Sequence, residues 1–171
     1  CGKSSSIARY VNDSFSTDYN TTIGADFVRK TVELTPKTSI KLQLWDIAGQ
    51  DRFATLIRPY YQNAKGAVIV CDVSRQASID AVKLWKKELD EKLDPVKIPT
   101  VLLANKCDLL ETGMKTFTTG ARIQRICSEY GFDGWFITSA KDGSNILEAF
   151  DYLGDCMIEK TISGKDEDFL L

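Results

Sequence analysis

Short apolar runs alternate with segments of helical spacing along most of this chain. Each apolar run is bounded by polar residues, glycine or proline, as buried strands are. The runs occupy residues 40–45, 67–71, 101–104 and 135–138. Apolar residues recur at helical spacing in residues 77–93, 121–130 and 146–158. Strand and helix in alternation predict an α/β domain with a mainly parallel sheet.

One strand breaks the parallel pattern. Residues 25–34 form another strand-like segment, and the stretch Thr35 to Ser39 joins it to the strand that starts at Ile40 as a hairpin. The predicted fold is a central parallel sheet with one antiparallel edge strand and helices on both faces. On the helix at 77–93 we expect Trp85 and Leu89 to lie in the core.

Length and charge limit the organisation and the partners. A chain of 171 residues with 43% apolar residues can bury the core of one domain. We place that domain at residues 1–162 and expect 163–171 to be a flexible acidic tail. A balance of 22 Lys+Arg against 24 Asp+Glu leaves no basic surface for nucleic-acid phosphates, so nucleic acid is not an expected partner.

Histidine is absent and cysteine is odd in number. Zero histidines exclude Ser-His-Asp triads, Cys-His nucleophiles and histidine metal sites. Five cysteines without C-x-x-C pairing predict reduced, inert thiols in a cytosolic protein. No run of 18 apolar residues and no apolar leader are seen, so the sequence predicts a soluble monomer, attached to membranes only through a segment outside it.

The chain opens on Gly2-Lys3-Ser4-Ser5, followed by a helical pattern. This matches the end of the phosphate loop G-x-x-x-x-G-K-[ST], in which backbone N–H groups at a helix N-terminus hold phosphates. Lys3 would reach the β- and γ-phosphates, and the Ser4 hydroxyl would bind Mg²⁺. Taken alone, G-K-S also occurs in surface turns.

A second motif, Asp46-Ile47-Ala48-Gly49-Gln50, follows an apolar strand. An acid at the carboxyl end of a central strand beside a phosphate loop is where an Mg²⁺ partner belongs. The Gly49 N–H could then reach the γ-phosphate, and Gln50 could orient the attacking water. A strand that simply ends in a turn is the alternative reading.

The most specific motif is Asn105-Lys106-Cys107-Asp108, which also follows a strand. The Asp108 carboxylate can accept from N1–H and the exocyclic amine of guanine, whereas adenine offers it no matching donors. Asn105 would brace the loop, and the Lys106 stem would cover the base. After the next strand comes Ser139-Ala140-Lys141, where a backbone N–H could donate to guanine O6.

Together these motifs resemble the small GTPases of the Ras superfamily, over nearly the whole chain. The segments Thr22 to Phe27 and Asp51-Arg52-Phe53, with Trp45, resemble the Rab family of membrane-traffic regulators. The stretch from Ile47 to Gln50, with Ala48 where most Rabs have Thr, and residues 131–136 resemble the Rab branch of lysosome-related organelles and melanosomes.

The resemblance implies further roles. Thr22 matches the threonine whose hydroxyl reaches Mg²⁺ and whose N–H senses the γ-phosphate of GTP. Phe15 matches the aromatic packed on guanine, and Tyr19 the one that closes over the phosphates. The second switch would run from Ala48 to about Tyr61.

The same resemblance implies partners and a location. Phe27, Trp45 and Tyr60 match the aromatic triad that Rabs present to effectors, although aromatic residues in strands are core residues by default. An exchange factor and a GTPase-activating protein are implied. The protein would work on the cytosolic face of endosomes or lysosome-related organelles when lipidated.

The sequence departs from the family pattern at both ends. It begins inside the phosphate loop, so the family's first strand and leading glycines are missing from it, and we read this as truncation. It ends at Leu171 with no cysteine after Cys156, whereas Rabs end in prenylated cysteines.

Two other functions stay open at this point. A GTPase-shaped scaffold with little or no nucleotide turnover would share the fold, although Gln50, Thr22 and Asp46 argue against it. A P-loop kinase or ATPase would lack the guanine-reading residues Asn105, Lys106 and Asp108.

Overall fold

The computed structural model of the chain describes residues 1–17, 22, 24–35, 38–47, 61, 63–110 and 114–167. The helices and strands in this part follow the predicted alternation. In chain order they are α1 Lys3–Asn12, β1 Ala25–Thr35, β2 Thr38–Ile47, β3 Ala67–Asp72, α3 Gln76–Asp80, α4 Val82–Leu93, β4 Thr100–Asn105, the short 3-10 helix η2 Cys107–Leu109, α5 Met114–Tyr130, β5 Gly134–Ile137 and α6 Ile146–Glu167. The α/β class is confirmed.

The strands form two hydrogen-bonded sheets. β3, β4 and β5 pair in parallel with β4 in the centre, and β1 and β2 pair antiparallel as the predicted hairpin. The single mixed sheet that we expected is therefore divided. Strands pair only at a spacing of about 4.8 Å, and no described strand lies between β2 and β3 to join the two sheets.

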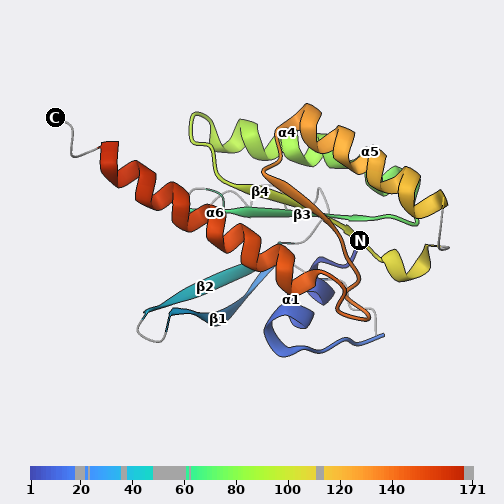
Figure 1. Cartoon of the computed structure of the whole chain (residues 1–171), viewed down its shortest axis with the longest axis horizontal. Helices are drawn as coiled ribbons and strands as arrows, with labels where there is room; N and C mark the ends of the chain where they lie inside the picture. The colour runs from blue at the N-terminus through green and yellow to red at the C-terminus, as the bar shows by residue number, and fades with distance from the viewer. Residues whose placement is uncertain are drawn as a thin grey trace.

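Helices cover both faces of the parallel sheet, as predicted. Figure 1 shows α4 and α5 on one side, with α6 and α1 on the other side, next to the hairpin. β4 is buried along its whole length, which explains its unbroken apolar sequence. β1 and β2 instead alternate: Val28, Lys30, Val32, Leu42 and Leu44 are half-buried, and Arg29, Thr31 and Gln43 between them are exposed.

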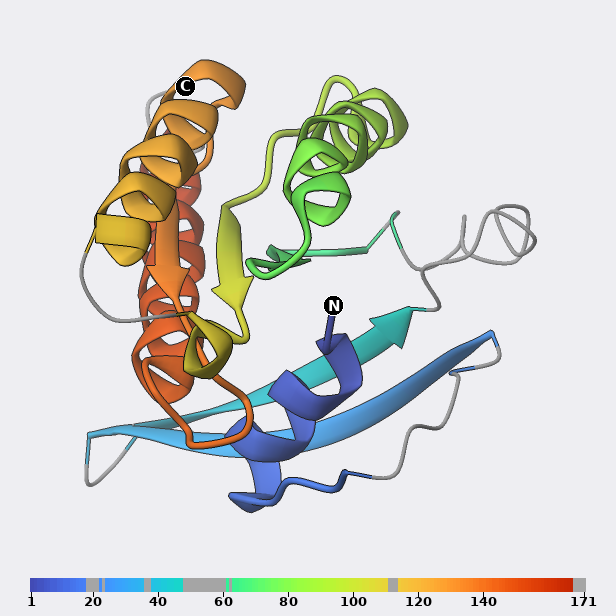
Figure 2. The same cartoon turned by 90° about the vertical axis from the view of Figure 1, so that its right-hand side faces the viewer.

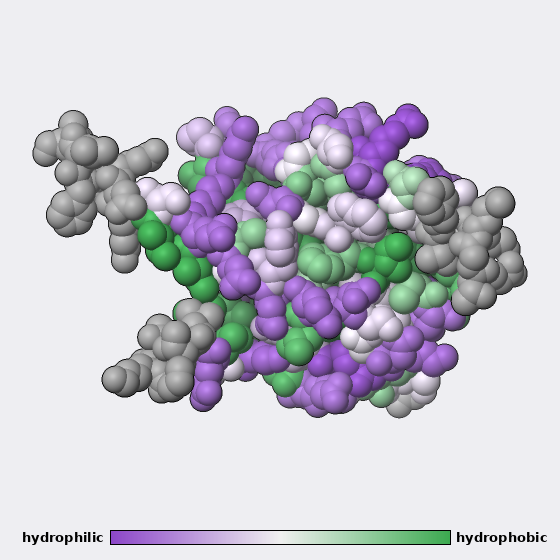
Figure 3. All heavy atoms as spheres, viewed as in Figure 1, coloured by the Kyte–Doolittle hydropathy of each residue, from purple (hydrophilic) through white to green (hydrophobic). Residues whose placement is uncertain are grey.

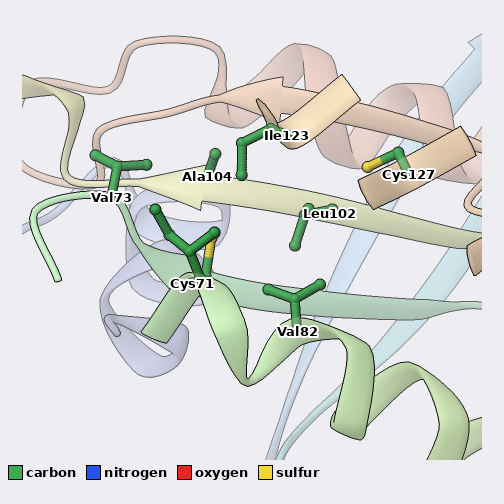
Figure 4. Packing of buried hydrophobic residues seen from close by; sticks show 8 residues of the cluster. Cys71, Val73, Val82, Leu102, Ala104, Ile123 and Cys127 are labelled. Atoms are coloured by element: carbon green, nitrogen blue, oxygen red, sulfur yellow. The ribbon is translucent and has the colours of Figure 1, made fainter. Parts of the chain in front are cut away.

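Two apolar clusters hold these layers together. The first joins β3 and β4 to α4 and α5, and Figure 4 shows Cys71, Val82, Leu102 and Ile123 converging in it. The second joins β4 to α1 and α6, where the rings of Tyr10 and Phe150 stack with centroids 4.4 Å apart. These clusters fix the positions of the strand ends.

Two of the five cysteines have the buried, inert environment that was predicted. All five are free thiols. Burial raises the pKa of both Cys71 and Cys127 to about 12, so these two stay protonated and unreactive at neutral pH.

The helix predicted at 77–93 is divided at Ala81, and Trp85 is a wrong prediction. Trp85 is 37% exposed, whereas Lys86 is 6% exposed. The buried residues of α4 are Val82, Lys86, Leu89 and Leu93, a spacing that turns Trp85 to the flank. Leu89 is in the core, as expected.

The last helix is longer than its apolar pattern indicated. α6 continues past Ile158 to Glu167, so residues 163–167, which we assigned to a flexible tail, are helical. Ile162 on this extension is 58% exposed, and Figure 3 shows apolar side chains along the projecting end of α6. No described helix is long and apolar enough to cross a membrane.

Candidate functional site

The carboxyl ends of the parallel strands meet the start of α1. Figure 2 shows the arrowheads of β4 and β5 pointing toward the end of the sheet where α1 begins. The loops after β3, β4 and β5 therefore lie together, which is where open α/β sheets bind ligands. Most of the predicted site residues that the structure describes gather at this end.

The N-terminus of α1 offers unpaired N–H groups. Its first backbone bond runs from the Ser6 N–H to the Gly2 carbonyl oxygen over 2.9 Å, so the amides of residues 3–5 have no partner within the helix. The first turn holds no acid and the helix has no side-chain cap. This end of the helix suits an anion, as the sequence predicted for Gly2, Lys3, Ser4 and Ser5.

Gly2 is needed for a close approach. Its φ is +93°, and a Cβ at this position would lie 2.5 Å from the Asn105 Nδ2 atom. Any other residue would therefore clash with Asn105 in addition to adopting an unfavourable backbone conformation. Gly2 lets the start of α1 pack directly on the loop after β4.

The three predicted metal ligands lie together. The Ser4 and Thr22 hydroxyls are 3.0 Å apart, Thr22 donates to the Asp46 Oδ2 atom over 3.3 Å, and Ser4 makes a short hydrogen bond to the same oxygen. The other oxygen, Asp46 Oδ1, is buried without a hydrogen-bond partner in the described part of the chain. A buried carboxylate oxygen without a donor is costly unless a cation or water satisfies it.

Asn105 links three segments. Its Nδ2 donates to the Cys1 carbonyl over 3.0 Å. Its Oδ1 accepts from the Ala140 N–H at 3.0 Å and from the Thr138 hydroxyl at 3.4 Å. Because Asn105 is fully buried, these bonds fix the phosphate-loop end of α1 against the loop after β5. The predicted bracing role therefore has a structural basis.

Asp108 stands beside the loop after β5. Its Oδ1 accepts from the Ser139 hydroxyl at 2.8 Å, and its Oδ2 lies 4.0 Å from the Lys141 Nζ atom. A carboxylate has about four acceptor positions, so Asp108 keeps capacity for a ligand after these contacts.

The backbone donors of Ser139, Ala140 and Lys141 are not equivalent. The Ser139 N–H donates to the Ser144 carbonyl over 3.1 Å, and the Ala140 N–H is engaged by Asn105. The Lys141 N–H bonds to no group in the described part of the chain. Lys141 is therefore the backbone donor best placed to meet a ligand carbonyl.

Asp72 is a site residue that the sequence reasoning missed. It is 2% exposed, and its Oδ2 lies 2.7 Å from the Lys106 Nζ atom. Burial alone would raise the pKa of Asp72, but hydrogen bonds from Lys106 and Ser74 outweigh it and lower that pKa. An acid at the carboxyl end of a strand was the signal used for Asp46, and it applies equally to Asp72.

Lys106 is held in a special conformation. Its φ is +68°, in the left-handed region, and Asp72 anchors its ammonium group. The Lys106 ammonium is therefore fixed against the carboxyl end of β3.

Comparison with known proteins decides the family. The Ras family model matches residues 1–159. The chain is 45% identical to Rab-32A of Dictyostelium discoideum over 94% of its length and 74% of that protein. It is 46% identical to human Rab-32, over 89% of this chain and 68% of that protein. It is 40% identical to human Rab-7L1, over 99% of this chain and 81% of that protein. The chain belongs to the Ras family.

Family membership establishes the general function. This Ras-family protein is a Rab-type small GTPase that binds guanine nucleotide, hydrolyses GTP and regulates membrane traffic. Proteins of this family work with effectors, exchange factors and activating proteins at endomembranes. The predicted resemblance to the Rab branch of lysosome-related organelles is confirmed by the likeness to Rab-32 and Rab-7L1.

Two of the three predicted effector-facing aromatics are exposed in this GTPase. Phe27 and Trp45 face each other across the hairpin register with ring centroids 5.0 Å apart. They are 44% and 38% exposed, on the side of the hairpin away from α1 and α6. The default expectation of core aromatics does not hold for this pair.

The remaining predicted residues are not joined to the site here. Phe15 follows α1 and is 38% exposed. Four predicted residues fall outside the described residues and stay predictions: Tyr19, Gly49, Gln50 and Tyr60. The same holds for the predicted second switch from Ala48 to about Tyr61, of which only Tyr61 is described.

Proposed function

We propose that this end of the sheet holds one guanine nucleotide, with its phosphates at α1 and its base between Asp108 and the loop from Ser139 to Lys141. The convergence of segments far apart in sequence carries the proposal. Asn105 alone bonds to groups at positions 1, 138 and 140. Such a buried link keeps the two ends of the site at a fixed separation, as a ligand with a base and phosphates requires.

We propose Mg²⁺ as the partner of the unpaired Asp46 oxygen. The Ser4 and Thr22 hydroxyls and the Asp46 carboxylate supply the hard oxygen atoms that this ion prefers. When bound, the ion would offset the charge that develops on the phosphates. Ser4, Thr22 and Asp46 have the chemistry needed to hold it.

The proposed switch depends on two loops. The Thr22 and Gly49 amides would bind the γ-phosphate of GTP, and loss of that group would release both loops. Lys3 would offset phosphate charge, and Gln50 would orient the attacking water. No arginine finger is evident in the sequence, so we expect slow hydrolysis that an activating protein accelerates roughly 10³- to 10⁵-fold.

We propose the following partners. Effectors would read the nucleotide state through Phe27, Trp45 and Tyr60, and an exchange factor would reload the site. The exposed Phe27–Trp45 pair supports a protein-binding role, since contacting aromatics on an exposed strand face are common at interfaces. Endosomes or lysosome-related organelles are the proposed location, reached through a lipidated tail.

The competing function is a GTPase-shaped scaffold with little turnover. The GTPase predicts nucleotide binding with turnover, whereas the scaffold predicts either no nucleotide binding or bound nucleotide without turnover. The cluster of Ser4, Thr22 and Asp46 supports Mg²⁺-dependent nucleotide binding, and so argues against a scaffold that binds no nucleotide. Phosphate release separates the GTPase from a scaffold that keeps its nucleotide unhydrolysed.

The test is a titration of the protein with fluorescent GDP and GTP, with Mg²⁺ or with EDTA, followed by single-turnover phosphate release. Mg²⁺-dependent binding with slow GTP hydrolysis, and no competition by ATP, is expected. Binding without any phosphate release would favour the scaffold. Equal binding of ATP and GTP would overturn the guanine assignment.

A further inference from the structure

Arg9 of α1 joins the helix to the loop after β5. Its Nε donates to the Ala140 carbonyl over 2.9 Å, and its Nη2 donates to the Lys141 carbonyl over 2.6 Å. One guanidinium therefore holds two consecutive carbonyl groups of the loop that we assign to the base. The Arg9 side chain is only 17% exposed, so little water competes for these bonds.

The remaining guanidinium nitrogen is fixed from the other side. Nη1 donates to the Asp13 carbonyl at 3.0 Å and to its carboxylate at 2.9 Å. Asp13 ends α1, with φ +49°. Since the guanidinium is planar and its donors have a rigid arrangement, the Asp13 contacts preset the direction in which Arg9 meets the loop.

The geometry of the peptide bond lets the Arg9 contact determine the direction of the next backbone N–H group. The Ala140 carbonyl and the Lys141 N–H belong to the same peptide plane, and in a trans peptide they point in opposite directions. When Arg9 holds that carbonyl toward α1, the Lys141 N–H must point away from α1. This is the donor that bonds to no other group in the described part of the chain.

We propose that Arg9 is a positioning residue for guanine recognition, which orients the Ala140–Lys141 peptide so that the Lys141 N–H meets guanine O6. Arg9 itself does not touch the ligand. The inference rests on the proposed placement of the base and adds the residue that aims one of its donors.

The alternative is that Arg9 only fastens α1 to the loop. Arg122 provides a matched control, because it makes the same kind of link elsewhere. It donates to Gln76 and, over 2.8 Å, to the Asp80 Oδ1 atom, which ties α5 to α3. Loss of Arg122 removes a comparable fastening that lies outside the proposed site.

The experiment measures the affinities of GDP, 6-thio-GDP and IDP for wild type, Arg9→Met, Arg9→Lys and Arg122→Met, together with each melting temperature. In 6-thio-GDP a poor sulfur acceptor replaces O6, so the GDP preference over it reports the O6 contact. IDP lacks the 2-amino group, so the GDP preference over it reports the Asp108 contact. Lysine keeps the charge of Arg9 but cannot donate to both carbonyls in a fixed plane.

In Arg9→Met we expect the preference for GDP over 6-thio-GDP to fall about 2- to 10-fold, the worth of one neutral hydrogen bond. The preference over IDP should not change, Arg9→Lys should be intermediate, and Arg122→Met should change only the melting temperature. If Arg9→Met does not fold, Arg9→Lys is used instead. Its preference for GDP over 6-thio-GDP should fall while its preference for GDP over IDP does not change.

Two results would overturn the proposal. One is a lower melting temperature of Arg9→Met with unchanged preferences for GDP over 6-thio-GDP and over IDP. Arg9 would then only fasten α1 to the loop. The other is an equal fall of the two preferences, which would mean that all contacts to the base are weakened and not the O6 contact alone. Failure of the wild type to bind GDP would instead remove the proposed nucleotide site, and this is seen before any variant is compared.

Discussion

The two ends of the proposed site differ in how completely the protein satisfies its own polar groups. At the base end, Asn105 is buried and its side chain bonds to three other residues, and Asp108 accepts from Ser139. At the phosphate end, Ser4 and Thr22 both contact one oxygen of Asp46, and the other oxygen has no partner among the described groups.

This difference indicates a division of labour. In the proposed site, the side chains of the base end already bond to one another, so we expect that end to select guanine with little rearrangement. At the phosphate end, a cation would give the unpaired Asp46 oxygen a partner, so we expect the structure of this end to respond to what is bound. A nucleotide switch needs both ends. The constant end recognises the guanine base, and the responsive end distinguishes which phosphates are bound.

The largest expected effect is at the responsive end. Gln50→Leu should keep nucleotide affinity but abolish the stimulated rate, a loss of roughly 10³- to 10⁵-fold, because nothing then orients the water. Single-turnover phosphate release with an activating protein is the measurement. A variant that turns over as fast as wild type would remove Gln50 from the mechanism.

The next effect is at the constant end. Asp108→Asn should weaken GTP binding about 10- to 100-fold, the range for a hydrogen bond to a charged group, and improve XTP, whose 2-oxo group accepts from the new amide. Competition titrations with both nucleotides measure it. Unchanged affinities for GTP and XTP would show that Asp108 does not read the base.

An effect of similar size, confined to the Mg²⁺-dependent part of binding, separates the two ends. Asp46→Asn should reduce the Mg²⁺-dependent part of GDP affinity about 10- to 100-fold, the usual cost of changing a group that hydrogen-bonds to metal ligands, as Asp46 does to Ser4 and Thr22. The preference for GDP over IDP should not change. Titrations of GDP and IDP, each with Mg²⁺ and with EDTA, measure the Mg²⁺-dependent part of the affinity and the preference for GDP over IDP. A change in base preference would mean that the ends are not independent.

The smallest effect concerns the Asp72–Lys106 pair. Because the pKa of Asp72 is lowered in the folded protein, the ionised pair contributes stability above the ordinary pKa of aspartate. That contribution is lost as the pH falls through the lowered pKa. Asp72→Asn should therefore melt at a lower temperature than wild type at neutral pH, and the gap should close on acidification. A gap independent of pH would contradict the ionised pair.

Much of this division was readable from sequence, because strands 67–71 and 101–104 are continuous apolar runs followed at once by polar motifs. Asp46, Asn105 and Asp108 were found because their spacing from strand ends is local information. Arg9 was missed because its role depends on contacts with Ala140 and Lys141, which only the fold brings near. Asp72 was missed although it follows a strand as Asp46 does, and only the fold shows its pairing with Lys106.

Two predictions were wrong because the spacing of apolar residues is an imprecise guide to a helix. Trp85 fits a helical apolar pattern, but the neighbouring Lys86 takes the buried position and pairs with Asp90 over 2.6 Å. Periodicity locates the buried face of a helix only to within about one residue, and a long lysine stem can bury as well as an aromatic side chain. The length of α6 was underestimated because its last turns lack the apolar pattern used to find it.

The most direct test of one site with two different ends is an amide NMR titration of the protein with Mg²⁺ and three ligands: GDP, guanosine and pyrophosphate. GDP should shift the amides of both Lys3–Ser4 and Ala140–Lys141, guanosine only the second pair, and pyrophosphate only the first. Shifts at a single end with all three ligands, or the same pattern when adenosine replaces guanosine, would contradict this division of the site.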